Sequence, residues 1–191
     1  MAEQSTVPPS PWNIANALTI LRVVLVPVFG WLLLREGGDD DGSRIAAFVA
    51  FGIAMLTDQI DGELARRRGL VTDFGKIADP IADKALTGMA FVGLSILGEL
   101  PWWVTVIVLV REWGITAMRF AVIRYGVMAA NRGGKLKTAL QTLALGLYLL
   151  PLPGWFDPVE ATVMGIAVLV TVVTGVDYVL SAIRLRRSAT S

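Results

Sequence analysis

The chain has 191 residues, of which 54% are hydrophobic and only 17% are charged, and its mean hydropathy is +0.63. Because about a quarter of the residues in soluble domains are charged, this composition excludes an ordinary water-soluble globule and favours a protein embedded in lipid. The absence of cysteine and histidine excludes disulfides, Cys/His zinc sites, thiol nucleophiles and histidine acid–base chemistry, and the net charge of +1 gives no reason to expect a nucleic-acid partner.

Six apolar runs follow one another along the chain. The first, residues 15–34, is interrupted only by Arg22 and is long enough to cross a hydrocarbon core of about 30 Å as a helix. The second continues without a break into an acidic segment. The second to sixth runs cover residues 45–56, 77–97, 102–123, 136–152 and 159–183. We therefore predict an all-α integral membrane fold with six transmembrane helices, in a single polytopic membrane domain over residues 1–191.

The basic residues are sorted by membrane side if these spans alternate. One side carries Arg66, Arg67, Arg68, Lys76, Arg124, Arg132, Lys135, Lys137, Arg184, Arg186 and Arg187, whereas the other carries only Arg35 and Arg44. The positive-inside rule then places both termini in the cytoplasm, and we expect the protein in the cell membrane. Four tryptophans near the external boundaries fit an aromatic belt: Trp31, Trp102, Trp103 and Trp155.

The chain ends carry weaker signals. Residues 1–12 are expected to form a flexible tail, and the segment from Trp12 to Ile14 a short interfacial helix. The first residues lack the pattern of a removable signal peptide, so none is expected. Residues 184–191 are expected to form a basic cytoplasmic tail.

Acidic residues gather where the second span ends and the third begins. Asp58 and Asp61 share a helical face at a spacing of three, and Asp79 and Asp83 do so at a spacing of four. A short cytoplasmic loop makes the two spans antiparallel neighbours, so the four carboxylates are predicted to converge. Such a cluster requires a counter-ion, because each charged acid costs about 2.5–3.5 kcal/mol within a membrane helix and like charges repel.

Hard divalent cations fit this donor set. Oxygen ligands without histidine or cysteine favour Mg²⁺, Mn²⁺ or Ca²⁺, and two such ions can clamp a diphosphate during in-line displacement. Gly62 and Ala65 are small, so a ligand can approach this face of the helix closely. The guanidinium of Arg66 can bind a phosphate through two hydrogen bonds. Solvation at the membrane interface explains any one of these acids alone, and helix packing explains Gly62 or Gly75 alone, but the complete spaced set favours a metal site.

The pattern Asp-x-x-Asp-Gly-x-x-Ala-Arg, eight residues, and Gly-x-x-x-Asp-x-x-x-Asp resembles the signature of the CDP-alcohol phosphotransferases, and residues 58–83 match every fixed position. The resemblance implies six transmembrane helices, usually in a homodimer, around a cytosol-facing cavity. It also implies that the four aspartates hold two divalent ions, Mg²⁺ or Mn²⁺, and that Asp83 is the general base. The residues implied to line the CMP moiety are Gly62, Ala65, Arg66, Thr72 and Gly75.

The implied reaction needs no histidine or lysine nucleophile. Asp83 takes the proton of an alcohol, the alcohol oxygen attacks the β-phosphorus of CDP-diacylglycerol, and CMP leaves with its charge held by metal and Arg66. In the first span, Asn16 and Thr19 share a helical stripe with Arg22. They either border the nucleotide cavity or pack as polar groups between helices.

The signature does not identify the acceptor alcohol, so residues elsewhere in the chain must indicate it. Ionisable residues inside a span normally line a cavity or pair with each other. Four cations in the fourth span and at the start of the fifth are predicted to bind an acceptor phosphate: Arg111, Arg119, Lys135 and Lys137. A local salt bridge from Arg111 to Glu112, and anchoring of the lysines at the interface, are the alternatives. The segment from Gly133 to Lys135 is not a P-loop, because Leu136 replaces the Ser or Thr and no strand precedes it.

Three further segments extend the resemblance to bacterial members of the family that use glycerol 3-phosphate: residues 13–22, 111–116 and 134–141. The chain departs from the common pattern at Ala15, where proline is frequent, and at Thr57, where serine is frequent. Asp177 and Tyr178 also match, without an assigned role. The competing hypotheses are another acceptor (inositol phosphate, serine or phosphatidylglycerol), a divalent-cation transporter and a structural membrane scaffold.

Overall fold

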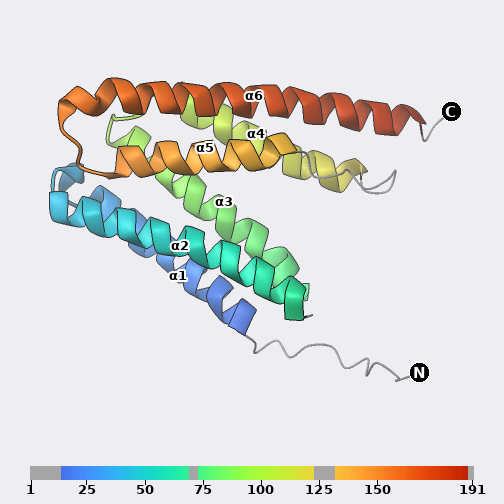
Figure 1. The fold of residues 1–191 in the computed structure, drawn as a ribbon, viewed down its shortest axis with the longest axis horizontal. Helices are drawn as coiled ribbons and strands as arrows, with labels where there is room; N and C mark the ends of the chain where they lie inside the picture. The colour runs from blue at the N-terminus through green and yellow to red at the C-terminus, as the bar shows by residue number, and fades with distance from the viewer. Residues whose placement is uncertain (1–13, 69–72, 123–131, 189–191) are drawn as a thin grey trace. The chain divides into compact units, whose positions relative to one another are not determined.

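The computed structural model describes the backbone of residues 14–68, 73–122 and 132–188. Side chains are described in these ranges except at residue 15 and in 59–80, 119–132 and 186–188. The described residues form six α-helices and two short 3₁₀ helices and contain no strand, which confirms the predicted all-helical fold. The chain divides into two compact units, residues 1–93 and 94–191 (Figure 1).

The first unit contains α1 (Ile14–Leu34), η1 (Arg35–Gly38), α2 (Asp41–Arg68) and most of α3 (Asp73–Ile96). α1 and α2 form an antiparallel hairpin (Figure 1). Its core includes Phe29 and Leu33 of α1 and Phe51 of α2, and the two phenylalanine rings lie 5.8 Å apart. The hairpin turns through η1, where Glu36 and Gly37 have left-handed backbone angles.

The start of α2 is fixed by a side-chain cap. The Asp40 carboxylate accepts hydrogen bonds from the backbone N–H and the hydroxyl of Ser43, at 2.9 and 2.5 Å. These bonds satisfy a backbone donor that the first turn of a helix otherwise leaves without a partner. They also hold the pKa of Asp40 below its usual value of 3.8, the side-chain bond contributing most.

Small residues let α1 and α3 approach closely. A Cβ atom added at Gly93 of α3 would lie 2.6 Å from Leu33 Cδ2, and one at Gly30 of α1 would lie 2.9 Å from Met89 Sδ. Both distances are shorter than ordinary van der Waals contact, so the absence of a side chain sets the spacing of these helices.

The second unit contains the end of α3, α4 (Trp102–Val122), α5 (Arg132–Leu149), η3 (Gly154–Phe156) and α6 (Asp157–Ser188). α6 packs along both α4 and α5. The backbone leaves α3 through Gly98, whose φ is +78°, and the N–H groups of Glu99 and Leu100 both donate to the carbonyl of Leu94. These bonds are the usual means of ending a helix at a left-handed glycine.

Several helix boundaries differ from the predicted runs. α2 extends from Asp41 to Arg68, well beyond the apolar run at residues 45–56, because the acidic and basic segment after it continues the helix. α5 begins at Arg132, before the apolar run, and ends at Leu149, before the predicted Leu152. The early end follows from Pro151, since the residue before a proline avoids the α conformation.

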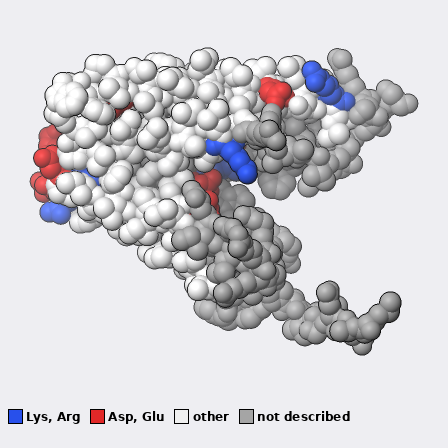
Figure 2. All heavy atoms as spheres, viewed as in Figure 1, with Lys and Arg blue, Asp and Glu red and all other residues white. Residues whose placement is uncertain are grey.

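Two segments of the described chain are long and apolar enough to cross a membrane: Asn16–Gly38 and Gly154–Leu185. Many of their large apolar side chains are exposed, among them Trp31, Leu169 and Val173. Figure 2 shows a described surface that is mostly uncharged. Apolar surface of this extent is typical of a protein that faces lipid. The other four spans and the orientation of the termini stay predictions.

Candidate metal and phosphate sites

The signature residues lie on helices, with the spacing that the sequence analysis assumed. α2 carries Asp58, Asp61, Gly62, Ala65 and Arg66, and α3 carries Gly75, Asp79 and Asp83. Side chains are described for two of the four aspartates, Asp58 and Asp83, and both are partly buried. Thr72 lies outside the described residues, and the side chains of the other signature residues lie outside the described part of these helices.

Asp58 is held by an arginine from α1. Arg22 Nη1 donates to Asp58 Oδ1 at 2.5 Å. The Arg22 side chain is completely buried, whereas 35% of the Asp58 side chain remains exposed. A buried guanidinium is tolerated only when its charge is paired, so this bond links the middle of α1 to the start of the signature.

The polar stripe of α1 is confirmed as a buried face. Asn16 and Thr19 are 4% and 1% exposed and lie about two turns and one turn, respectively, before the buried Arg22. Their predicted contact with a nucleotide stays a prediction. The sequence analysis noted Arg22 in this stripe but missed its partner on α2. Arg22 interrupts an otherwise apolar run, and a charged residue in such a run normally pairs with an opposite charge, so the sequence already indicated an acidic partner.

The donor chemistry of the signature fits divalent cations. Its four candidate ligands are carboxylates, which hard cations such as Mg²⁺ and Mn²⁺ prefer, and a carboxylate that accepts one hydrogen bond can still bind a metal through its remaining lone pairs. Within the residues whose side chains are described, no three acidic side chains are placed so that they could hold a metal ion. Because the side chains of Asp61 and Asp79 are outside that set, the four-aspartate site remains a prediction.

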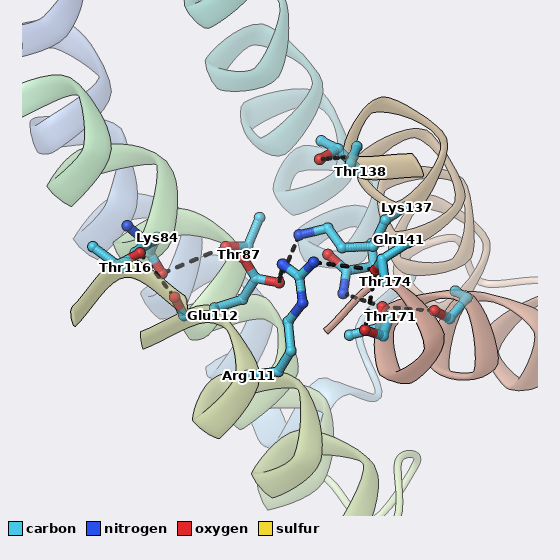
Figure 3. Close-up of polar contacts among 12 residues, drawn as sticks. Lys84, Thr87, Arg111, Glu112, Thr116, Lys137, Thr138, Gln141, Thr171 and Thr174 are labelled. Atoms are coloured by element: carbon cyan, nitrogen blue, oxygen red, sulfur yellow. Dashed lines mark hydrogen bonds and ion pairs between the residues drawn. The ribbon is translucent and has the colours of Figure 1, made fainter. Parts of the chain in front are cut away.

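In the second unit, two of the predicted acceptor cations meet at one carboxylate. Arg111 Nη1 and Lys137 Nζ both donate to Glu112 Oε1, at 3.1 and 2.6 Å (Figure 3). The side chains of Arg111, Lys137 and Glu112 are 12%, 8% and 19% exposed, respectively. The cluster joins α4 to α5 and lies away from water, where ion pairs are screened least.

α6 completes the surroundings of Arg111. The guanidinium Nη2 donates to the hydroxyl of Thr174 at 3.1 Å, and the guanidinium carbon lies 5.7 Å from the centre of the Tyr178 ring. A Cβ atom at Gly175 would lie 3.1 Å from Arg111 Cγ, so this glycine leaves room for the arginine stem. Arg111 is therefore oriented by α6 as well as by Glu112 on its own helix.

The glycine pair at the start of α5 serves helix packing. An added Cβ would lie 2.9 Å from Thr174 Cγ2 at Gly133 and 3.4 Å from Tyr178 Oη at Gly134. This close contact with α6 agrees with the conclusion that the segment is no P-loop. A buried hydrogen bond from Gln141 Nε2 to Thr171 Oγ1, at 2.9 Å, continues the polar contact between α5 and α6 (Figure 3).

The structure separates the two predicted lysines. Lys137 is buried beside Glu112, whereas Lys135 is exposed. The difference follows from helix geometry, because residues two apart point in nearly opposite directions on a helix with 3.6 residues per turn. Arg119 lies on α4, and its side chain is outside the described part. The sequence analysis considered the Arg111–Glu112 pair but missed the contributions of Thr174 and Tyr178.

Comparisons with known proteins give consistent results. The model of the CDP-alcohol phosphatidyltransferase family matches residues 12–173. A Mycobacterium tuberculosis protein named probable phosphatidylglycerophosphate synthase is 54% identical over 172 residues, which cover 90% of this chain and 82% of that protein. A Bacillus subtilis protein named CDP-diacylglycerol–glycerol-3-phosphate 3-phosphatidyltransferase is 35% identical over 180 residues, covering 87% and 93%. A Shigella flexneri protein of the same name is 33% identical, covering 90% and 95%.

Proposed function

This chain belongs to the CDP-alcohol phosphatidyltransferase family, and we propose that it transfers the phosphatidyl group from CDP-diacylglycerol to glycerol 3-phosphate. The products are phosphatidylglycerophosphate and CMP, which makes the chain an enzyme of phospholipid biosynthesis. The observation that carries the proposal is the identity of 54% over 90% of the chain to a protein named probable phosphatidylglycerophosphate synthase. The match of residues 58–83 to the family signature supports it independently.

The reaction assigns a role to each part of the signature. Asp58, Asp61, Asp79 and Asp83 would hold two divalent cations, Mg²⁺ or Mn²⁺, which supply neutralising charge for the diphosphate and for the departing CMP. Gly62, Ala65, Arg66, Thr72 and Gly75, with Asn16 and Thr19 of α1, would line the nucleotide.

Proton transfer is assigned to Asp83. Its carboxylate accepts the proton of an acceptor hydroxyl, and the oxygen so released forms a bond to the β-phosphorus of CDP-diacylglycerol. The bond from that phosphorus to the CMP oxygen breaks, and CMP leaves with the electron pair. The proton stays on Asp83 until it passes to solvent.

The acceptor phosphate is assigned to the cations of the second unit. The assignment of Arg111 and Lys137 is supported by their ion pairs with the same Glu112 oxygen. Arg119 and Lys135 complete the proposed set. A fixed guanidinium and an ammonium together suit a phosphate, which accepts hydrogen bonds on several oxygens.

The proposed enzyme is a homodimer in the cell membrane, with six spans and with both termini and the active site facing the cytoplasm. Two apolar segments long enough to span the bilayer and the exposed apolar side chains of the helices support the membrane location. The distribution of basic residues between the two sides supports the orientation.

The test is CMP release from CDP-diacylglycerol by detergent-purified protein. Glycerol 3-phosphate, inositol 1-phosphate, serine and phosphatidylglycerol are compared as acceptors, each with Mg²⁺, with Mn²⁺ and with a chelator. We expect release only with glycerol 3-phosphate and only with a divalent cation. Release with a different acceptor would overturn the acceptor assignment, and no release with any of them, together with Mn²⁺ uptake into proteoliposomes, would favour a transporter.

A further inference from the structure

The contacts around Glu112 set it apart from an ordinary salt-bridge partner. A single oxygen, Oε1, accepts hydrogen bonds from both Arg111 on α4 and Lys137 on α5. The guanidinium and the ammonium are therefore brought side by side within reach of one small anion (Figure 3). All three side chains are largely shielded from water.

The positive charges of Arg111 and Lys137 repel each other at this short separation. Their repulsion increases as the surrounding dielectric constant falls, and here the three side chains are largely shielded from water. The carboxylate between them offsets this repulsion. Without it, Lys137 would gain by turning its flexible stem away from Arg111, since a lysine ammonium is a mobile, strongly hydrated charge.

Contacts from neighbouring helices orient both cations. Arg111 has contacts to α6 that are independent of Glu112: the Thr174 hydroxyl, the Tyr178 ring and the space left by Gly175. For Lys137, the contact with Glu112 at 2.6 Å is a short, charge-assisted hydrogen bond to a neighbouring helix. Glu112 is therefore the shared partner that brings the cations of α4 and α5 together.

We propose that Glu112 is a positioning residue for the acceptor phosphate: its carboxylate holds Arg111 and Lys137 together so that both can donate to one phosphate group. The proposal rests on the proposed function, which assigns the acceptor phosphate to these cations. It adds that an acidic residue, which would repel a phosphate if it acted alone, is required for phosphate binding because it organises the cations that bind it. In this proposal, Glu112 contacts neither the transferred phosphorus nor the nucleotide.

The test compares Glu112→Ala and Glu112→Gln with wild type in the CMP-release assay. We expect Glu112→Ala to raise KM for glycerol 3-phosphate by about tenfold or more, as the loss of hydrogen bonds to charged groups implies. It should weaken competitive inhibition by inorganic phosphate by a similar factor. KM for CDP-diacylglycerol should stay close to the wild-type value. Glu112→Gln keeps an acceptor oxygen in the same place but loses the charge, so its KM should lie between the other two.

The matched control is Thr171→Val, which removes the buried hydrogen bond with Gln141 between α5 and α6 at a residue outside the proposed phosphate site. It should lower the thermal unfolding midpoint without changing the ratio of the two KM values. Equal changes in both KM values for the Glu112 variants, or unchanged inhibition by phosphate, would overturn the proposal. If Glu112→Ala does not fold, the isosteric Glu112→Gln carries the same comparison. Absence of CMP release by wild type would instead contradict the proposed function.

Discussion

At the scale of single residues, the proposed chemistry depends on carboxylates whose surroundings differ. Asp58 is hydrogen-bonded to a buried arginine, whereas the backbone carbonyl of Asp83 accepts a hydrogen bond from the hydroxyl of Thr87 at 3.0 Å. An arginine partner stabilises the charged form of a carboxylate, which suits a metal ligand. The assignment of proton transfer to Asp83 instead comes from the family resemblance.

Asp83→Asn tests the assignment of the general base. The amide is isosteric with the carboxylate but takes no proton, so CMP release should fall by about 10²–10⁴-fold while the unfolding midpoint stays close to wild type. Turnover and thermal unfolding are measured on the same preparation. Asp39→Asn, at an exposed acid between α1 and α2, is the control and should retain full activity. Substantial residual release from Asp83→Asn would contradict the assignment.

Arg22→Ala tests the ion pair between α1 and α2. Removing a buried partner leaves the other charge uncompensated, which costs about 3–5 kcal/mol in comparable buried pairs, and the lower end is expected here because Asp58 is partly exposed. The free energy of unfolding is measured for Arg22→Ala, Asp58→Asn and the double variant. The double variant should be less destabilised than the sum of the two single variants. Strict additivity would show that the two groups do not interact.

At the scale of elements, helix ends and helix spacing are set by a few local groups. The cap formed by Asp40 fixes where α2 begins and so the register of every signature residue on it. The α2 signature was correctly expected on a helix because no proline or glycine-rich turn interrupts residues 45–68. The apolar run itself stops at Leu56, so the end of this helix at Arg68 could not be predicted from hydropathy, because a mixed charged segment has no apolar period to mark it.

The cap predicts a specific pH dependence. The pKa of Asp40 is lower in the folded protein than its usual value of 3.8, because the ionised carboxylate accepts two hydrogen bonds from Ser43. Its ionised form therefore stabilises the fold above the unfolded pKa, and this stabilisation is lost as the pH falls through the lower folded pKa. Thermal unfolding of wild type and Asp40→Asn should differ most near neutral pH, and the difference should shrink below about pH 3.8. A difference that does not change with pH would argue against this role.

Gly93→Ala tests the close contact between α1 and α3. The new methyl group would meet Leu33 Cδ2 at 2.6 Å, so overpacking should reduce the free energy of unfolding by about 1–3 kcal/mol. Gly52→Ala on α2 is the matched control, because an added Cβ there meets no atom within 4 Å. It should be neutral or slightly stabilising, since alanine favours a helix more than glycine does. Equal effects of the two substitutions would exclude a packing role for Gly93.

At the scale of the whole molecule, the apolar surface and the basic residues determine how the protein lies in a membrane. The exposed side chains of α1 and α6 are largely apolar, and lipid is the solvent that such surfaces require. The positive-inside distribution then predicts which end of each span faces the cytoplasm.

The natural absence of cysteine allows this orientation to be tested without background labelling. Single variants Asp39→Cys and Trp155→Cys, at exposed positions between the runs predicted from the sequence, should react with a membrane-impermeant maleimide on intact cells. Arg184→Cys, near the end of α6, should react only after the membrane is opened. The wild-type chain, which has no cysteine, serves as the control for background labelling. Labelling of Arg184→Cys on intact cells would invert the predicted topology.

The sequence by itself determined the features that depend on local order along the chain. The six apolar runs predicted six helices, and the described residues form six α-helices, because each run is long enough for several helical turns. The spacing of the four aspartates on helical faces likewise follows from the helix repeat. The family was identifiable for the same reason, since its signature lies within 26 consecutive residues, 58–83.

Only the tertiary structure decided which distant residues meet. Arg22 and Asp58 are 36 positions apart, Glu112 and Lys137 are 25 apart, and Arg111 and Thr174 are 63 apart. These pairs depend on how helices rotate and approach each other, which small residues such as Gly93 and Gly175 control. Periodicity shows that a charged residue within a span must be paired, because an isolated charge is costly there, but the partner is chosen by packing between helices.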